Sequence, residues 1–448
     1  MINYIEDPDS LLFTLGVINF DISAFHPHFP SYPVFCCLAK MCYYVTDRFS
    51  VAFSILGGSS LFIIIVYALK ILSVPLKSLE GGLTAALLFF NPMIWVMSNK
   101  FMPDLLGVAL LMASLYYLLC DPKGNKYHIW LGYFLAGLLG GVRLSYLPFL
   151  FIPIVYGLLE NKRYFSSLSM LSVGILIWIV PMLLHTGWEP MMSMTHLQSQ
   201  SHFSDFGGAF YKHSNIGTRV VRLAQSLWAD GLGAYWSGRN WVTILLSIAI
   251  VPFLFFGAMI LLSFDFSLRK VAVISFSCTF FGLWVLLFQN IIYDSRHILP
   301  FIPFLVIVIC YGIIYFLVNF NTYFTKVTLT IVLICYLYIG LSAALQHMKP
   351  SAIAQINTHL AQKEKNAELN IVSIPMVNFY LAKQGVKAHF FSAAKDVEKI
   401  KKLKGNIIIV GNFEHLVSAE PRARYTFKHD PYINRIWPQI SASEYLVP

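Results

Sequence analysis

Charged residues are scarce in this sequence: Asp, Glu, Lys and Arg make up only 12% of its 448 residues, whereas 57% are hydrophobic. Ordinary soluble domains are roughly 25% charged and about 45–50% apolar, so this scarcity argues against a chain of two or three soluble domains. The formal net charge is +10, but the basic residues stand in the gaps between apolar runs. That distribution is typical of a membrane protein and argues against nucleic-acid binding.

No CxxC pair occurs among the seven cysteines, and four of them lie inside apolar runs or at their ends. We therefore expect neither a disulfide framework nor a zinc site, and interpret them as small hydrophobic residues of membrane helices. A signal peptide is also lacking, because the first ten residues contain three carboxylates and no apolar run. If the chain begins outside, we expect either a further helix upstream of Met1 or translocation of this segment with the first hairpin.

Apolar stretches predict an α-helical polytopic membrane protein with about ten transmembrane helices. Most stretches are long enough to cross roughly 30 Å of hydrocarbon at about 1.5 Å per residue. Two are short, and because they flank Arg143 we expect short helices that meet in the outer half of the membrane. The stretches are 51–73, 81–98, 104–120, 128–142, 144–159, 167–185, 241–263, 271–288, 298–319 and 326–346.

The short connections between these stretches predict the orientation. One set carries Lys70, Lys77, Lys123, Lys126, Lys162, Arg163, Arg269, Lys270 and Lys326, and the alternate set carries only Lys100, Arg143 and Arg296. Loops rich in Lys and Arg face the cytoplasm, so we expect the first set there. The sequence thus predicts a multi-pass protein of the plasma membrane, or the bacterial inner membrane, with an extracytoplasmic active site.

Three parts of the chain are distinguished by composition: a first outer loop with amphipathic segments, a transmembrane domain that includes a long outer loop, and a tail outside the membrane. Their residues are 1–50, 51–346 with the loop 186–240, and 350–448. The tail predicts a small soluble α/β domain, with strands at 370–374, 387–391 and 406–410 and helices at 376–385 and 394–403. Its Val410-Gly411-Asn412 turn lacks the further glycines of a dinucleotide-binding fingerprint.

An acidic cluster, Glu6-Asp7-Pro8-Asp9, precedes the first amphipathic segment. Three carboxylates in four residues repel one another unless a cation or a substrate hydroxyl lies near. A general base needs such a carboxylate within hydrogen-bond reach of the proton that it removes. The composition alone slightly favours the alternative of a solvated acidic N-terminus.

Five stretches together resemble the polytopic membrane glycosyltransferases of the GT-C class. They are the acidic cluster with HPHFPSYPVF, then NPMIWVMSNKFMPDLLGVALLMASLYYLL, GLLGGVRLSYLPFLFIPI, YDSRHILPFIPFLVIV and HDPYINRIWPQI. Within that class the chain is most similar to the protein O-mannosyltransferases and the bacterial aminoarabinose and other polyprenyl-phosphate-sugar transferases. It departs from the family because no membrane span precedes its acidic motif. That motif also matches two variants, an adjacent acidic pair at Glu6-Asp7 and a DxD at Asp7-Pro8-Asp9, which share Asp7.

The resemblance implies a sugar donor linked to polyprenyl or dolichyl phosphate, and transfer to an acceptor hydroxyl of a glycan, lipid or protein at the outer membrane surface. Transfer with inversion needs a base for the acceptor hydroxyl and a cation at the departing phosphate. Asp7 is the expected base, and Glu6 and Asp9 are expected to hold the acceptor or a cation. A divalent metal ion is compatible with this motif but is not required by the sequence.

Arginines at the membrane edge are the candidates for the donor phosphate, because the planar guanidinium suits phosphate oxygens. Arg296, between Asp294 and His297, is the first candidate. Arg143 is either a phosphate ligand or a partner for Asp104, which lies at the family's acidic position. Lys100 is either a rim anchor or a phosphate contact.

Asp104 and His297 are also candidates for substrate binding, and the remaining candidates are histidines in the proline-rich stretch. His26 and His28 are two residues apart, so an extended chain places them on one face, where they bind donor phosphate, acceptor or metal, or are plain loop residues. His185, His196, His202 and His213 lie in or beside the outer loop 186–240. No pair of them has the i, i+4 spacing of a helical zinc site.

Three other functions compete with a glycosyltransferase. A transporter or flippase of lipid-linked sugars needs ionisable residues in mid-span, whereas the charges here gather at the ends of the apolar stretches. An O-antigen type polymerase or ligase is expected to carry arginines in a long outer loop, as Arg219, Arg222 and Arg239 do here, but not an acidic first loop. A structural or receptor role is the third alternative.

Overall fold

The computed structural model describes residues 1–448 apart from 120–124, 205–214, 264–267, 321–322 and 364–368. Lys123 and His213, named above, therefore lie outside the described residues. The chain forms two compact units. Unit 1 consists of Met1–Leu12 and Leu345–Pro448, and unit 2 is Phe13–Ala344. Helices α1 and α15 each begin in one unit and end in the other.

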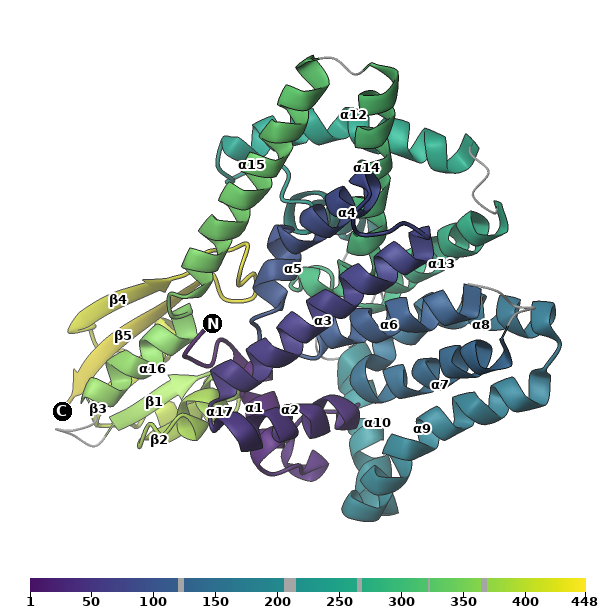
Figure 1. The fold of residues 1–448 in the computed structure, drawn as a ribbon. Coiled ribbons are helices and arrows are strands. Elements are labelled where there is room, and N and C mark those ends of the chain that lie inside the picture. The colour runs from purple at the N-terminus through teal and green to yellow at the C-terminus, as the bar shows by residue number, and fades with distance from the viewer. Residues whose placement is uncertain (120–124, 205–214, 264–267, 321–322, 364–368) are drawn as a thin grey trace. The chain divides into compact units, whose positions relative to one another are not determined.

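Unit 2 is helical throughout its described residues (Figure 1). Its elements, with the two helices that it shares, are α1 (Pro8–Ile18), η1 (Ile22–Ala24), α2 (Pro33–Thr46), α3 (Phe49–Leu72), α4 (Leu79–Phe89), α5 (Pro92–Met97), α6 (Asp104–Leu119), α7 (Lys126–Arg143), η2 (Leu144–Tyr146), α8 (Leu147–Asn161), α9 (Tyr164–Thr186), α10 (Trp188–Ser204), α11 (Ile216–Gln225), η3 (Ser226–Gly231), α12 (Val242–Ser263), α13 (Leu268–Phe288), η4 (Ser295–Phe301), α14 (Ile302–Asn319) and α15 (Tyr323–His347).

Membrane-spanning capacity follows from length and composition. Among the described residues, seven helical stretches are long and apolar enough to cross a membrane, which makes this a multi-pass membrane protein. One of them, Lys126–Asn161, contains both α7 and α8, which correspond to the two short predicted spans on either side of Arg143. The predicted total of about ten crossings stays a prediction.

One predicted span is not a single helix. The stretch 81–98 is divided into α4 and α5 by Asn91 and Pro92. Proline fits the first turn of a helix but not its interior, so Pro92 starts α5. The Asn91 side chain accepts a hydrogen bond from the Ile94 amide at 3.0 Å and thereby caps α5. The described residues of the loop 186–240, which is predicted to lie outside, are largely helical, since they contain α10, α11 and the π-helical turn η3.

Helix α6 lies at the centre of the first half of unit 2. It is buried on most sides and packs against α3, α7 and α8, and against η4 at its N-terminal end. Next to it, α7 and α9 approach to backbone contact, because a Cβ added at Gly137 would lie 2.4 Å from the Leu171 carbonyl oxygen. A Cβ at Gly174 would lie 2.3 Å from the Phe134 carbonyl oxygen. Such small-residue contacts are the usual way in which membrane helices associate.

Unit 1 contains a five-stranded mixed sheet in the order β2-β1-β3-β5-β4. β1 pairs in parallel with β2 and β3, whereas β5 is antiparallel to β3 and β4. The apolar residues of β1, β3 and β5 build its core. The elements are α16 (Ala352–Lys363), β1 (Leu369–Ser373), α17 (Pro375–Lys383), β2 (His389–Ser392), α18 (Val397–Ile400), β3 (Gly405–Val410), η6 (Glu414–Leu416), β4 (Ala423–Lys428) and β5 (Gln439–Val447).

The predicted C-terminal α/β domain is thus present, with its three predicted strands as β1, β2 and β3. The predicted helix 394–403 is reduced to the single turn α18. The antiparallel strands β4 and β5 were not predicted from the sequence. β4 alternates between exposed and half-buried residues, as expected for a strand at the edge of the sheet.

Candidate functional site

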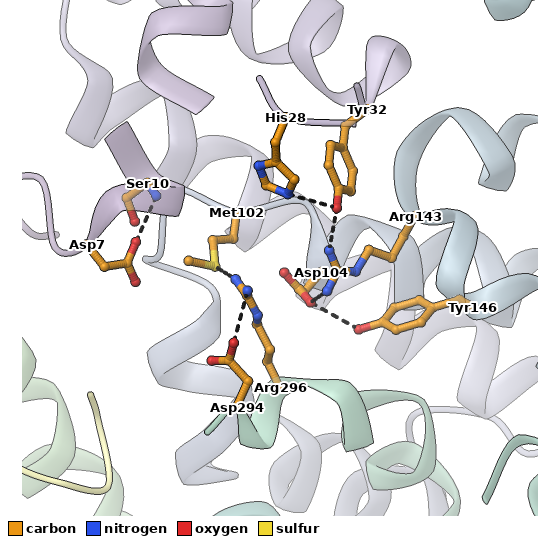
Figure 2. Close-up of polar contacts among 10 residues, drawn as sticks. All are labelled: Asp7, Ser10, His28, Tyr32, Met102, Asp104, Arg143, Tyr146, Asp294 and Arg296. Atoms are coloured by element: carbon orange, nitrogen blue, oxygen red, sulfur yellow. Dashed lines mark hydrogen bonds and ion pairs between the residues drawn. The ribbon is translucent and has the colours of Figure 1, made fainter. Parts of the chain in front are cut away.

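A buried ion pair joins α6 to α7. The Arg143 guanidinium, in the last turn of α7, lies 2.9 Å from the Asp104 carboxylate at the start of α6 (Figure 2). The Tyr146 hydroxyl donates a 3.4 Å hydrogen bond to the same carboxylate oxygen. A negative charge at a helix N-terminus and a positive charge at a helix C-terminus both interact favourably with the helix dipole. Because α6 and α7 are consecutive and antiparallel, these two ends meet.

Close packing fixes this pair. A Cβ added at Gly107, one turn after Asp104, would lie 2.8 Å from the Arg143 Cβ and 3.0 Å from ring carbons of Tyr146. Only glycine therefore fits between α6 and these two side chains. Two atoms of the pair, Asp104 Oδ2 and Arg143 Nε, are buried and have no hydrogen-bond partner within the described residues. The ion pair thus has unused hydrogen-bonding capacity on both sides.

A chain of polar contacts leads from Arg143 to the proline-rich stretch. The guanidinium donates a 3.2 Å hydrogen bond to the Tyr32 hydroxyl, which lies 3.3 Å from His28 Nε2 (Figure 2). The centre of the guanidinium is also 5.6 Å from the Tyr32 ring and 5.7 Å from the Tyr146 ring, within the range of cation–π attraction. Phe13 packs edge-on against His28 and Tyr32. His28 is thereby coupled to Arg143 through one tyrosine.

Arg296 lies at the start of η4, beside the N-terminal end of α6. Its guanidinium is 3.2 Å from the Asp294 carboxylate and donates to the Met102 thioether (Figure 2). Its side chain is 12% exposed, twice the 6% of Arg143. The charge of Arg296 acts on Arg143 and Tyr146, so the two arginines share one electrostatic environment. Of the two, Arg296 is the cation more accessible to a ligand.

The acidic cluster belongs to unit 1. Glu6 is fully buried, and its carboxylate lies 3.0 Å from His347 Nε2, while its backbone carbonyl accepts a 2.6 Å hydrogen bond from Ser351. Tyr4 donates to the His347 carbonyl oxygen at 2.7 Å, and Tyr380 donates to the Ile5 carbonyl oxygen at 2.6 Å. The N-terminal residues are therefore held in the C-terminal domain by specific hydrogen bonds.

Asp7 caps α1. Its Oδ1 accepts a 2.8 Å hydrogen bond from the Ser10 amide, and Asp9 follows in the first turn of the helix (Figure 2). The positive end of a helix dipole favours carboxylates at these positions. The pKa of Tyr4 is raised by burial and then by the negative charges of Glu6 and Asp7. The pKa of Tyr380 is raised by burial and by the same two carboxylates. Both phenols are thus kept neutral beside the acidic cluster.

No protein-family model and no curated protein sequence matches this chain. Its fold, however, is similar to that of solved structures. ArnT from Cupriavidus metallidurans, solved bound to undecaprenyl phosphate, superposes with a TM-score of 0.57 over 98% of this chain and 94% of that chain, at 11% identity. Apo ArnT from the same organism gives a TM-score of 0.54 over 99% of this chain and 94% of that chain, at 10% identity. The chain has a GT-C-like fold.

Within this GT-C-like fold, the predicted site residues divide between the two units. Glu6, Asp7 and Asp9 belong to unit 1, and the other seven belong to unit 2: His26, His28, Lys100, Asp104, Arg143, Arg296 and His297. His26 exchanges backbone hydrogen bonds with Asp21 and is half-buried. His297 is buried in η4, and Lys100 is half-exposed just before α6. Among the described residues no group of three His, Cys, Asp or Glu side chains lies close enough to hold a metal ion.

Sequence reasoning missed the neighbours that orient these residues. Tyr32 and Tyr146 contact Arg143, and Met102 contacts Arg296. Asp294, which the sequence had already placed beside Arg296, is its ion-pair partner. Tyr146 stands three residues after Arg143, but only the turn η2 brings it back to Asp104.

A π-helical turn supports η4 within the GT-C-like fold. η3 packs against both η4 and α5. The Asn91 side chain donates a 2.8 Å hydrogen bond to the Gly231 carbonyl at the end of η3, and Arg239 lies 3.1 Å from Asp230 in the same turn. π-Helical turns are rare and occur often at functional sites. This turn holds the element that carries Arg296 and His297.

Proposed function

We propose that this protein is a membrane glycosyltransferase that transfers a sugar, with inversion, from a polyprenyl (or dolichyl) phosphate to an acceptor hydroxyl at the outer membrane surface. The observation that carries the proposal is the ArnT fold over 98% of the chain, because one of the matching structures holds undecaprenyl phosphate. The multi-pass helical architecture supports a substrate whose lipid tail stays in the bilayer.

The reaction needs a base on one side of the anomeric carbon. We assign this role to Asp7: its carboxylate accepts the proton of the acceptor hydroxyl while the acceptor oxygen bonds to the anomeric carbon. The Ser10 amide, which donates to Asp7 Oδ1, keeps the carboxylate in a fixed direction. Glu6 is less suited to this task because it is fully buried and paired with His347. Asp9 keeps more exposure and would hold the acceptor or a cation.

The leaving group needs a cation. As the bond between the anomeric carbon and the phosphate oxygen breaks, negative charge grows on the polyprenyl phosphate, and a fixed guanidinium stabilises it. Arg296 fits this role, since its side chain is partly exposed and is held by Asp294 and Met102. Arg143 would act mainly through position, because its charge is paired with buried Asp104. Further candidates for contact with the donor or the acceptor are Lys100, His26, His28 and His297.

The competing functions find less support. Asp104, Arg143 and Arg296 lie at helix ends, whereas a transport pathway needs ionisable groups in mid-span. The loop arginines expected of an O-antigen polymerase or ligase are engaged with the protein itself. Arg219 donates to the backbone carbonyls of Leu286 and Gln289, Arg222 to the Gln225 side chain, and Arg239 to Asp230.

Purified protein in detergent tests the proposal. We expect a radiolabelled polyprenyl-phosphate sugar to be consumed and free polyprenyl phosphate to be released, with the label appearing on an acceptor. A panel of lipid-linked sugars is needed, and lipid-linked sugars compared between cells with and without the gene would choose its members. Translocation of the intact donor across proteoliposomes without release of polyprenyl phosphate would instead support the transporter.

The side of the membrane is a separate part of the proposal. We expect Gln200 and Lys401, which are both exposed, to be labelled by a membrane-impermeant thiol reagent from the outside when each is replaced by Cys. A Cys at Lys77 is expected to be labelled only after permeabilisation, because its loop belongs to the basic set. Labelling of residues 200 and 401 from opposite sides would refute this orientation.

A further inference from the structure

A cavity lies in unit 2, and none of the arginines described above lines it. It has a volume of about 560 Å³, within the range of small-molecule sites. The C-terminal turn of α3, together with α6, α12, α13, α14 and the last residue of η4, Phe301, forms its walls. Figure 1 labels these α-helices. Ile274, Phe304 and Leu305 are typical of its apolar lining. Nothing in the proposed sugar transfer uses this space.

Two lysines give this apolar cavity a positive rim. Lys70, in the last turn of α3, and Lys270, in the first turn of α13, both line it. The described lining residues include no Asp or Glu. The Lys70 ammonium lies 5.1 Å from the centre of the Tyr67 ring and 5.5 Å from that of Tyr116, which holds the exposed charge at the rim. An apolar interior below two ammonium groups fits an amphiphile with an anionic head.

A neighbouring groove shares this rim. It has a volume of about 530 Å³ and is also lined by Lys70, Ser73 and Tyr116. Its other walls are apolar side chains such as Phe62 and Leu76. The cavity and the groove therefore share a wall that contains the Lys70 cation. We call the two spaces and the residues Lys70 and Lys270 the lysine cleft.

We propose that the lysine cleft binds one anionic phospholipid with two acyl chains. Its phosphate lies between Lys70 and Lys270, one chain lies in the cavity and the other lies in the groove. Ammonium groups are established phosphate ligands, and basic pockets between membrane helices bind anionic head groups. Apolar space at bilayer depth is filled by hydrocarbon rather than by water. A polyprenyl phosphate has a single chain and would leave either the cavity or the groove unfilled.

The lysine cleft is distinct from the proposed donor site. Lys70 and Lys270 belong to the basic set of loops, which the charge bias predicts on the cytoplasmic side, whereas Arg296 belongs to the alternate set. The cleft therefore selects a lipid of the cytoplasmic leaflet. It would act as a structural lipid site that fills the gap between α3 and α13.

Lipid binding to delipidated, full-length protein in detergent tests this site. Native mass spectrometry would compare phosphatidylglycerol, phosphatidylcholine and undecaprenyl phosphate. Each lysine near an anionic lipid head group contributes a factor of about five to the affinity, so Lys70→Ala/Lys270→Ala is expected to weaken phosphatidylglycerol binding about 30-fold. Lys77→Ala/Arg163→Ala removes two cations of the same predicted side outside the cleft and is expected to bind like the parent protein.

A second variant separates the cleft from general surface charge. Ser275→Trp places a large ring in the first cavity, whose lining includes Ser275, and leaves both lysines in place. We expect it to lose tight phosphatidylglycerol binding while its melting temperature in detergent without lipid stays near that of the parent. Equal binding of phosphatidylcholine, a preference for undecaprenyl phosphate, or unchanged binding by the double lysine variant would each overturn the proposal.

Discussion

Asp104 and Arg143 form an ion pair of 2.9 Å whose two side chains are 0% and 6% exposed. Removal of one partner from a buried pair leaves an uncompensated charge and costs about 3–5 kcal/mol, whereas replacement of both by apolar residues is often neutral or stabilising. Replacement of one or both partners can therefore distinguish two roles of Arg143, as a structural partner for α6 and as a ligand for phosphate.

We expect Asp104→Asn and Arg143→Ala each to lower the free energy of unfolding by about 3–5 kcal/mol, and Asp104→Leu/Arg143→Met to regain most of it. Thermal unfolding in detergent measures this. Donor binding by the double variant then tests the second role. If the stable double variant binds donor normally, Arg143 is a structural residue; single variants as stable as the parent would contradict the buried pair.

The packing of Gly107 gives a second prediction. Gly107→Ala puts a methyl group 2.8 Å from the Arg143 Cβ, and such overpacking typically costs about 1–3 kcal/mol. Gly58→Ala in α3 is the matched control, because a Cβ there meets nothing within 4 Å. The control is expected to gain about 0.5–1 kcal/mol from helix propensity. Equal effects of the two substitutions on unfolding would contradict the close approach of α6 to Arg143.

At Arg296 we expect Arg296→Ala to reduce donor turnover far more than Arg296→Lys does. The lysine keeps a positive charge for the leaving phosphate, although it loses the planar fork. Loss of one such donor group typically costs about 100-fold to 1,000-fold in kcat. Turnover and donor binding of both variants are measured in purified protein. An alanine variant that folds and turns over normally would make Arg296 an anchor.

For Asp7 we expect Asp7→Asn to lower turnover on the order of 100-fold to 10,000-fold and to leave donor binding intact, because the amide keeps the shape but cannot take the proton. The Asn oxygen can still accept from the Ser10 amide, so α1 keeps its cap. Asp9→Asn is expected to be milder. Loss concentrated at Glu6 or Asp9 would assign the base to another member of the cluster.

His429 gives a prediction for pH. In the folded protein the pKa of His429 is lowered, mainly because burial removes water from the imidazole. Its Nε2 lies 3.2 Å from the Lys349 carbonyl oxygen. In the unfolded chain the group titrates near a pKa of about 6.5. As the pH falls through this value, the unfolded chain protonates this histidine before the folded protein does. The contribution of neutral His429 to stability is therefore complete above about pH 6.5 and is lost as the pH falls.

Hydrogen exchange of the 350–448 peptides in the full-length protein, followed from pH 7.5 to pH 5.5 after correction for the intrinsic rate, measures this loss. His429→Gln is expected to flatten the dependence. A variant with the same pH profile as the parent would assign the loss to another group.

The sequence predicted elements where periodicity or composition is strong. The apolar runs predicted the long apolar helices of unit 2, and β1, β2 and β3 followed from short runs of β-branched or aromatic residues in the tail. The break between α4 and α5 was missed because apolar residues flank Asn91 and Pro92 on both sides. Strands β4 and β5 were missed because their residues are polar at many positions. Their pairing comes from tertiary contacts, since β5 pairs with β3 and β4 pairs with β5.

The site was predictable as residue types but not as geometry. The edge arginines were found because charge is rare in apolar surroundings. The pairing of Glu6 with His347 depends on a contact 341 residues apart in the sequence, which no local pattern encodes. The cluster of Tyr32, Tyr146 and Arg143 likewise depends on the packing of α2 against α7.

Unit 1 takes its pieces from both ends of the chain, and this has a consequence for biosynthesis. A ribosome adds roughly 5–20 residues per second, so Met1–Leu12 emerge tens of seconds before the strands of the same unit exist. During that interval Glu6 has neither His347 nor Ser351 beside it. Met1–Leu12 therefore reach their final partners only after the later part of unit 1 has been made. A chain that stops short of residue 345 cannot complete the surroundings of its own acidic cluster.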